Sequence, residues 1–266
     1  MNSAAVSRAG SDRSGIQSVE VAGIILDALA RAPAAVQLKD LAEAAGMVPA
    51  KLHRYLVSLM RTGLVEQNSS TGRYDIGPLS LTLGLAALGR IDVVRSATEV
   101  LPGLRDAIGE TAVLAIWGER GPTVIRFEES SHPVTINVRV GSTLPVLRTA
   151  LGMALAAFSP STRIDEFVKT ERADLIRSGA SQWTAAHVAA AFDEVRAHGL
   201  ARITGDLVPG VAAMAAPVRD HLGIAVAAIG AIGRAAEFDL AWNGAIATVL
   251  RKTAAQVSAR LGCPDC

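Results

Sequence analysis

Hydrophobic residues recur at helical spacing in three short segments near the start of the chain. From Ser18 the apolar positions follow the i, i+3, i+4, i+7 pattern of a helix that buries one face, and Ala32-Pro33 ends it. A second predicted helix spans 38–45 and stops at Gly46, and Pro49 opens a third that Gly63 stops. The predicted buried positions are Val21, Ile24, Ile25, Ala28 and Leu29, then Leu38, Leu41, Ala42 and Ala45, then Leu52, Leu56, Leu59 and Met60.

Two short strands follow these helices. Residues 65–67 and 73–76 have strand character, and the Asn-Ser-Ser-Thr-Gly segment between them favours a turn. Three helices with a tight turn before the third, followed by a hairpin, predict a winged helix-turn-helix. We place this domain at 16–77, after a flexible tail at 1–15, and predict a linker at 78–91 with a helix over 79–89.

The pattern changes beyond this linker. Apolar segments separated by hairpin-length turns predict an antiparallel sheet with helices packed against it, which gives an α+β domain over 92–266. The predicted strands are 111–117, 123–128, 134–140, 210–217 and 224–231. The predicted helices are 93–108, 150–158, 184–198 and 241–261.

The third predicted helix carries three basic residues and no acidic one between Gly46 and Val65. In a helix-turn-helix the start of this helix faces base edges in the major groove, where Arg and Lys bind guanine or phosphate. The hairpin turn adds short polar side chains suited to phosphate. A solvated basic face of an unrelated bundle is the alternative. The candidate DNA contacts are Pro49, Ala50, Lys51, His53, Arg54, Ser58, Arg61, Ser69, Thr71 and Arg73.

Composition narrows the class of protein. The 266 residues are 50% hydrophobic, which excludes a disordered chain, and the net charge of +1 gives no global attraction to nucleic acid. The longest stretch without Asp, Glu, Lys or Arg runs only from Ser178 to Phe192, which is too short to cross a membrane. No secretory signal is visible at the start, so we expect a cytoplasmic protein.

Signatures of catalysis are missing from the sequence. It contains no Gly-Lys of a P-loop, no G-x-S-x-G and no H-E-x-x-H, and its five histidines are scattered. Cys263 and Cys266 form one C-x-x-C, but a structural zinc site needs about four ligands. We therefore expect no metal, no cofactor and no enzymatic activity. A DNA-bridging architectural protein without a sensor remains an alternative, as does, with less support, an enzyme.

Several motifs together resemble the IclR family of bacterial transcriptional regulators. They are IQSVE (16–20), LAEAAGM (41–47), LHRYLVSLMRTGLVEQ (52–67), TGRYDIG (71–77), VRVGSTLPVLRTALGMALAA (138–157) and PGVAAMAAPV (209–218). The resemblance implies a winged helix-turn-helix, a linker helix and a GAF/PAS-like effector domain. It also implies a homodimer or homotetramer that binds operator DNA, represses or activates a nearby catabolic operon, and responds to a small organic effector.

The sequence departs from the family's usual pattern at several positions. Lys51 stands where the family usually has Ser or Thr, so a different operator sequence is expected. In the effector domain Met153 replaces a Lys, Ala213 replaces a Cys, and Gly230 and Ile232 replace two serines. By this resemblance the candidate effector contacts are Leu144, Arg148, Thr149, Ala150, Leu151, Met153, Asp206, Ala213, Met214, Gly230 and Ile232.

These replacements predict a roomier and more apolar pocket than one that binds a small oxo-acid. Arg148 could pair with a carboxylate, and Asp206 and Thr149 are the other polar candidates. An aromatic acid or a phenol is the expected effector, rather than glyoxylate or pyruvate. The direction of the response to the effector stays open.

Overall fold

The chain forms two compact units that divide after Arg90. The computed structural model describes residues 15–90, 92–131, 138–179, 183–205 and 207–263. The tail expected at 1–15 therefore lies outside the described residues, apart from Gly15.

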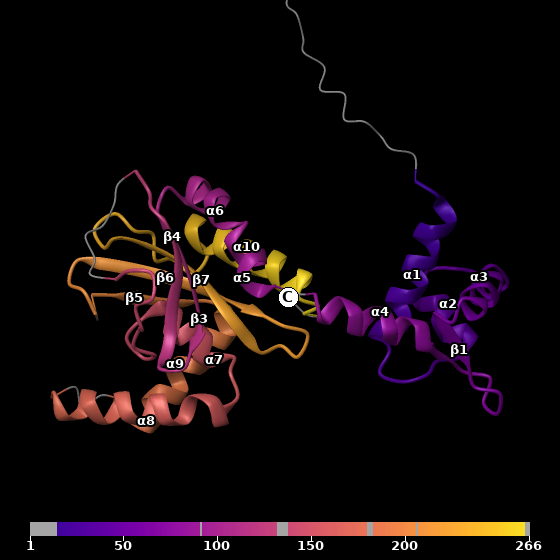
Figure 1. Ribbon diagram of the computed structural model, residues 1–266, viewed down its shortest axis with the longest axis horizontal. Coiled ribbons are helices and arrows are strands. Elements are labelled where there is room, and N and C mark those ends of the chain that lie inside the picture. Colours follow the sequence, from indigo (N-terminus) through magenta and orange to yellow (C-terminus); the bar gives the residue numbers. More distant parts are fainter. Residues whose placement is uncertain (1–14, 91, 132–137, 180–182, 206, 264–266) are drawn as a thin grey trace, which may run out of the picture. The chain divides into compact units, whose positions relative to one another are not determined.

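The first unit contains three helices, a two-stranded hairpin and a further helix (Figure 1). The elements are α1 (Gln17–Arg31), α2 (Leu38–Ala44), α3 (Pro49–Arg61), β1 (Val65–Gln67), β2 (Tyr74–Ile76) and α4 (Pro78–Leu88). Val36 pairs with Tyr74 in a short bridge that fixes the hairpin to the segment before α2. This arrangement is the winged helix-turn-helix that the sequence predicts.

Glycines end α2 and α3 where the sequence places them. Gly46 has φ of +63° and Gly63 has φ of +76°, a conformation that costs glycine little. The core of the unit contains Ile25 and Leu29 from α1, which are 0% and 4% exposed. Ile24 was predicted in the same stripe but is 53% exposed, because α1 is covered along a narrower face than its apolar pattern suggests.

The second unit is built on a five-stranded antiparallel sheet of order β4-β3-β7-β6-β5. Its strands are β3 (Thr111–Gly118), β4 (Gly121–Glu128), β5 (Ala201–Thr204), β6 (Val211–Arg219) and β7 (Ala225–Arg234). Its helices are α5 (Val93–Thr98), α6 (Leu101–Ile108), α7 (Ala150–Ala157), α8 (Ser161–Arg177), α9 (Ala185–His198) and α10 (Ala245–Arg260).

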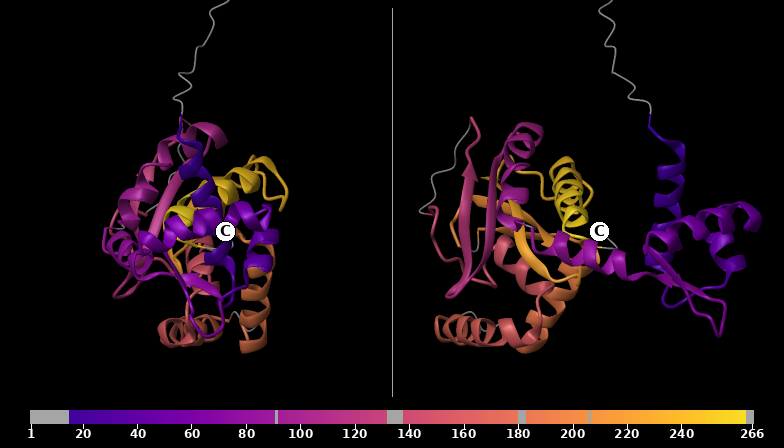
Figure 2. Two further views of the ribbon diagram at one scale, coloured as in Figure 1. Left: turned by 90° about the vertical axis from the view of Figure 1, so that its right-hand side faces the viewer. Right: turned by 45° about the vertical axis from the view of Figure 1, so that its right-hand side comes forward.

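Helices cover both faces of this sheet, and each face has its own hydrophobic core. One core joins the sheet to α5, α6 and α10, and the other joins it to α7, α8 and α9. Figure 2 shows the sheet between these two groups of helices. The α+β class and the antiparallel order predicted from the sequence are confirmed.

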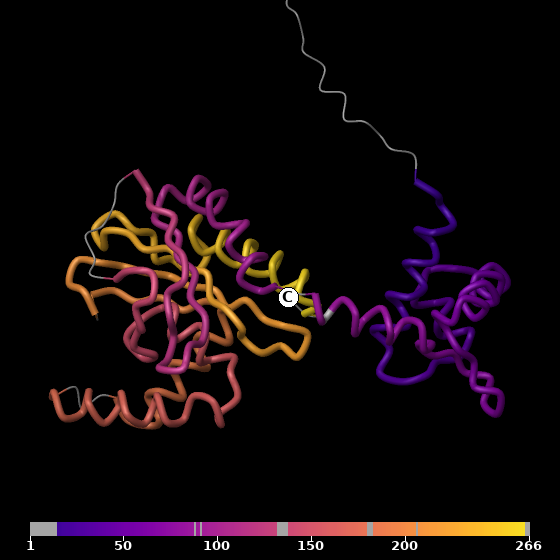
Figure 3. The backbone as a smooth tube through the Cα atoms, in the orientation of Figure 1, coloured from indigo at the N-terminus to yellow at the C-terminus, as the bar shows by residue number. Residues whose placement is uncertain are grey.

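The sequence predicted one helix over 93–108, but the structure has two. Pro102 lacks a backbone N–H, and its ring clashes with the carbonyl four residues earlier in a continuous helix, so the chain breaks between α5 and α6. Strand β5 and the whole of α8 were not predicted from the sequence. The backbone of α8 is the long salmon coil along the lower edge of the second unit in Figure 3. Of the strand predicted at 134–140, residues 134–137 lie outside the described residues, and 138–140 are not in a strand.

Among the described residues, no helix is long and apolar enough to cross a membrane.

Candidate functional site

One side of α3 is buried and the other is exposed and basic. Leu52, Leu56 and Leu59 pack into the core of the first unit. The predicted contacts on α3 are all exposed, namely Pro49, Ala50, Lys51, His53, Arg54, Ser58 and Arg61. None of the ion pairs found among the described residues involves Lys51, Arg54 or Arg61. This face can therefore present its positive charge to an external anion.

A groove of about 380 Å³ runs between this face and the first turn of α1. Lys51, Arg54, Tyr55 and Ser58 line it together with Ser18. Sequence reasoning did not select Ser18 and Tyr55. The sequence pattern assigned Tyr55 neither to the buried face of α3 nor to its basic face. In the structure Tyr55 is half-buried and forms part of the groove wall.

The hairpin turn is held by its own side chains. The Asn68 side-chain amide oxygen accepts hydrogen bonds from the backbone N–H groups of Ser70 (3.0 Å) and Thr71 (2.9 Å). The Arg73 guanidinium donates to the Ala35 carbonyl at 3.0 Å, which ties the turn back to the body of the unit. Ser69, Thr71 and Arg73 are exposed, as a wing that contacts DNA requires.

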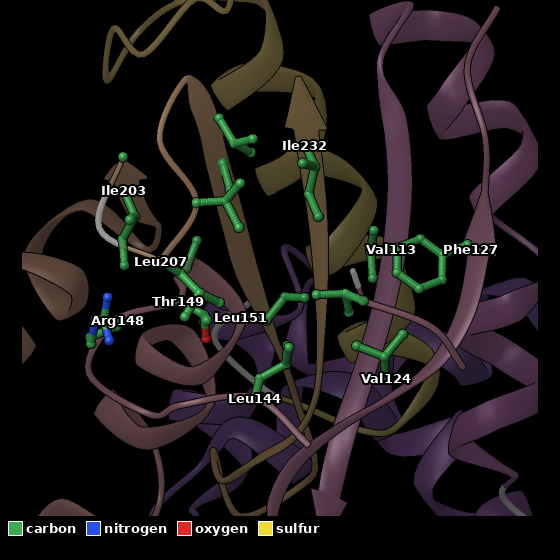
Figure 4. Close-up of a pocket in the computed structure, with 16 residues that line it drawn as sticks. Val113, Val124, Phe127, Leu144, Arg148, Thr149, Leu151, Ile203, Leu207 and Ile232 are labelled. Carbon is green, nitrogen blue, oxygen red and sulfur yellow. The ribbon is translucent and has the colours of Figure 1, made fainter. Parts of the chain in front are cut away.

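A second candidate site lies between the sheet and α7 in the second unit. It is an apolar cavity of about 70 Å³. Figure 4 shows Val113, Val124 and Phe127 from β3 and β4 on one side, and Ile203 and Leu207 on the other. The remaining lining residues are Val138, Leu144, Arg148, Thr149, Ala150, Leu151, Gly205, Val208, Val211, Ala213 and Ile232.

Seven of the predicted effector contacts line this cavity, namely Leu144, Arg148, Thr149, Ala150, Leu151, Ala213 and Ile232. Met153, Met214 and Gly230 do not line it. Asp206 lies outside the described residues. The structure therefore gathers most of the predicted set around one space.

Strand alternation explains why Met214 is absent from the cavity. Successive side chains of a strand point to opposite faces of the sheet, so Ala213 and Met214 lie on different faces. Ala213 packs with the α7 core, whereas Met214 is fully buried in the α10 core. The prediction that both line the pocket is wrong for this reason.

Helix packing explains the other two positions. A Cβ added to Gly230 would lie 3.0 Å from the Leu151 side chain and 3.0 Å from the Met214 carbonyl oxygen, so Leu151 covers this glycine. Gly230 lets α7 approach the sheet closely, and it does not leave an open place for a ligand. Met153 lies farther along α7 and lines a separate pocket beside Trp183 and Trp242.

Few polar groups reach the cavity. The Thr149 hydroxyl donates to the Pro145 carbonyl at 2.6 Å and accepts from the Gly152 N–H at 3.0 Å, because Thr149 caps α7. Its hydrogen-bonding capacity is therefore largely used within the chain. Arg148 is half-buried and is the charged residue among the lining side chains.

Nine lining residues were not selected from the sequence. Val113 lies in β3, and Val124 and Phe127 lie in β4, two strands that the sequence predicted. Val124 and Phe127 are three residues apart and share one face only because the pairing of β3 with β4 shifts register between Leu114 and Ala115, an irregularity that alternation does not reveal. Ile203 lies in the missed strand β5, and Leu207 and Val208 lie in the loop after it. For these residues the sequence offered apolar character but no spacing that pointed to a shared site.

A carboxylate from α8 binds the segment that leads into α7. The Val146 N–H donates to Glu171 Oε2 at 2.6 Å, and the Leu147 N–H lies 3.1 Å from Oε2 and 3.2 Å from Oε1. Burial raises the pKa of Glu171 above its ordinary 4.5, while these hydrogen bonds and the charge of Arg148 act in the opposite direction. Glu171 was not singled out in the sequence because α8 was not predicted.

This raised pKa gives a stability prediction for Glu171→Gln. The native protein binds the Glu171 proton more tightly than the unfolded chain, so the free energy of unfolding falls as pH rises from 4.5 through the raised pKa. Glutamine lacks this titration, so the variant should gain stability relative to wild type over that interval. Urea unfolding at about pH 4 and about pH 7 measures the difference, and a relative stability that stays flat or falls contradicts it.

Two family models match the chain. The model described as the IclR helix-turn-helix domain matches residues 18–69, and the model described as bacterial transcriptional regulator IclR C-terminal matches residues 85–259. The chain belongs to the IclR family of transcriptional regulators. The resemblance seen in the sequence is confirmed, and the function of the chain as a DNA-binding regulator follows from it.

Individual proteins that are similar to the chain cover between 68% and 94% of it. A glycerol operon regulatory protein of Streptomyces griseus is 32% identical over 253 residues, which are 93% of this chain and 97% of the relative. The crystal structure of Pseudomonas aeruginosa HmgR matches with a TM-score of 0.79 and 39% identity, covering 94% of this chain and 100% of HmgR. A Pca regulon regulatory protein of Pseudomonas putida is 28% identical and covers 68% of this chain and 61% of the relative.

The two candidate sites lie within the two matched domains. The exposed face of α3 belongs to the matched helix-turn-helix, and the cavity belongs to the matched C-terminal domain. The family consists of transcriptional regulators, so transcriptional regulation is favoured over the alternative functions of an enzyme or an architectural protein.

Proposed function

We propose that this IclR-type regulator binds operator DNA through α3 and the hairpin turn, and binds a single-ring aromatic acid or phenol in the cavity beside α7. In this proposal residues 16–77 bind DNA, 78–91 form the linker, and 92–266 bind the effector. The observation that carries it is the apolar cavity with one arginine at its wall, within the matched C-terminal domain. The glycerol operon regulators among the relatives support control of an operon.

The exposed residues of α3 would divide the work of DNA recognition. Lys51 and Arg54 lie within the first two turns, the part of a recognition helix that faces base edges. Ser58 and Arg61 lie farther along and suit phosphate, as do Ser69 and Thr71 of the hairpin turn. Two such helices in a dimer would occupy major-groove faces about 34 Å apart.

Helix α4 supports a homodimer or a homotetramer. It carries leucines on opposite sides, and Leu81, Leu83 and Leu85 are 63%, 55% and 59% exposed. A helix with exposed leucines on opposite sides is stable in water only when another surface covers it. A second copy of the chain would supply that surface.

Leu81→Glu combined with Leu85→Glu is expected to shift the protein toward monomer, because two carboxylates would be buried in the proposed contact. These residues lie four positions apart and share one side of α4. Light scattering at several protein concentrations measures the mass. Thr82→Glu, at an exposed position of the same helix, is the control. An unchanged mass for the double variant would exclude this side of α4 from the contact.

The lining of the cavity argues for an aromatic ligand. Small oxo-acids are polar and bind mainly through hydrogen bonds and charge, whereas this lining is apolar, the Thr149 hydroxyl is engaged within the chain, and Arg148 is the charged lining residue. An apolar ring gains about 25 cal/mol for each Å² that it buries. The cavity volume of about 70 Å³ is far below the roughly 300–1,000 Å³ of pockets that hold drug-sized ligands, so the ligand should be no larger than a single ring.

Benzoate or phenol should therefore bind the full chain at least about ten times more tightly than glyoxylate or pyruvate, a difference of about 1.4 kcal/mol. Calorimetric titration with each of the four compounds measures it. Equal or reversed affinities would remove the apolar-cavity argument, while the regulator assignment would stand on its own evidence.

A further inference from the structure

The side chain of Glu171 fills a concave turn of backbone N–H groups. The backbone N–H groups of Val146 and Leu147 donate to its two oxygens at 2.6–3.2 Å. Successive N–H groups arranged in this way form an anion-binding site in many proteins. Here the anion comes from α8 of the same chain.

The backbone that Glu171 holds is also the wall of the cavity. Leu144, Arg148 and Thr149 line the cavity and flank the two residues that donate to the carboxylate. Thr149 fixes the other end of this segment by capping α7. The backbone at Arg148 is therefore held on both sides, by the contact with Glu171 before it and by the Thr149 cap after it. Together these contacts set the direction of the Arg148 side chain.

Glu171 itself does not line the cavity. It lies four residues from Phe167 on one side of α8, and Phe167 stacks on Trp117 of β3 with ring centroids 5.6 Å apart. Ile164 and Leu175 complete the buried contacts of α8. This side of α8 thus joins the segment before α7 to the β3–β4 hairpin.

We propose that Glu171 is a positioning residue of the effector site, holding the 146–148 backbone so that Arg148 and Thr149 take their places at the cavity wall. The inference rests on the proposed function of the cavity. It predicts that ligand affinity depends on a side chain that does not touch the ligand.

The test compares Glu171→Ala and Glu171→Gln with Glu166→Gln, which changes an exposed glutamate of the same helix. Hydrogen exchange of the full chain, without ligand, reports on the backbone of residues 144–149. Benzoate titration of the same proteins reports on affinity. We expect Glu171→Ala to speed exchange of this segment and to weaken benzoate binding, each at least about tenfold. Glu171→Gln keeps one acceptor oxygen and should fall between, and Glu166→Gln should match wild type.

Each result decides the proposal. Wild-type exchange at 144–149 in Glu171→Ala would overturn it, as would equally faster exchange of β7 and α10 in both Glu171 variants, which would indicate a general loss of stability. Faster exchange at 144–149 alone, with weaker benzoate binding, supports it. If wild-type protein fails to bind benzoate while exchange changes as expected, the proposed ligand class is wrong and the positioning of this backbone by Glu171 is supported.

Discussion

Replacing Lys51 and Arg54 together with alanine is expected to weaken operator binding at least about 30-fold. Each side chain is exposed on α3, and a base or phosphate contact of this kind contributes about 1–3 kcal/mol, so two removed contacts cost about 2–6 kcal/mol. Folding should be unaffected, because the core-facing Leu52, Leu56 and Leu59 are unchanged. Gel-shift titrations at one fixed salt concentration measure the loss.

The matched control removes the same charge elsewhere in the first unit. Arg31 and Lys39 are exposed and lie on α1 and α2, outside the face assigned to DNA. Their double replacement by alanine should change affinity only through long-range electrostatics, by less than about threefold. An equal loss in both double variants would mean that net charge, rather than this face of α3, governs binding.

Ala150→Glu is expected to abolish benzoate binding while operator binding persists. Ala150 is 2% exposed and lines the cavity, so a glutamate there occupies much of the 70 Å³ and places a carboxylate against an anionic ligand. Loss of ring burial and like-charge repulsion should together weaken binding by at least about 100-fold, or about 2.7 kcal/mol. Calorimetry with benzoate and gel shifts with operator DNA are the two measurements.

Two further variants separate this effect from misfolding. Ala213→Leu fills the cavity without adding charge and should also weaken benzoate binding. Ala189→Glu adds the same charge at an exposed position of α9 and should bind benzoate normally. If Ala150→Glu and Ala213→Leu both bind benzoate as wild type does, the ligand does not occupy this cavity.

The sequence predicted elements well where local signals were strong. Gly46, Pro49 and Gly63 bound α3 because their backbone preferences act locally, and the result is the predicted helix. Helix α8 was missed because its buried residues are few and its surface is charged, so tertiary contacts rather than pattern keep it in place. Pro102 divided a helix whose apolar spacing alone looked continuous.

The candidate site was predictable only in part for a related reason. The resemblance supplied Leu144, Arg148 and Ala213, whereas the alternation of side chains along β6 places Met214 on the opposite face of the sheet from Ala213. The contribution of Glu171 could not be predicted from the sequence. Glu171 lies in a helix that was not predicted, and it contacts backbone groups about 25 positions earlier in the chain. The residue types of a segment do not reveal where its backbone N–H groups point in the folded chain.

A regulator that binds operator DNA through α3 and an effector in the cavity, as proposed above, must couple these two binding events. When two ligands are coupled, each changes the affinity of the protein for the other by the same factor, typically about 5–150-fold. The decisive measurement is operator affinity with and without saturating benzoate, together with benzoate affinity with and without operator. The account predicts that both affinities change by the same factor. Benzoate that binds tightly yet leaves operator affinity unchanged would contradict it.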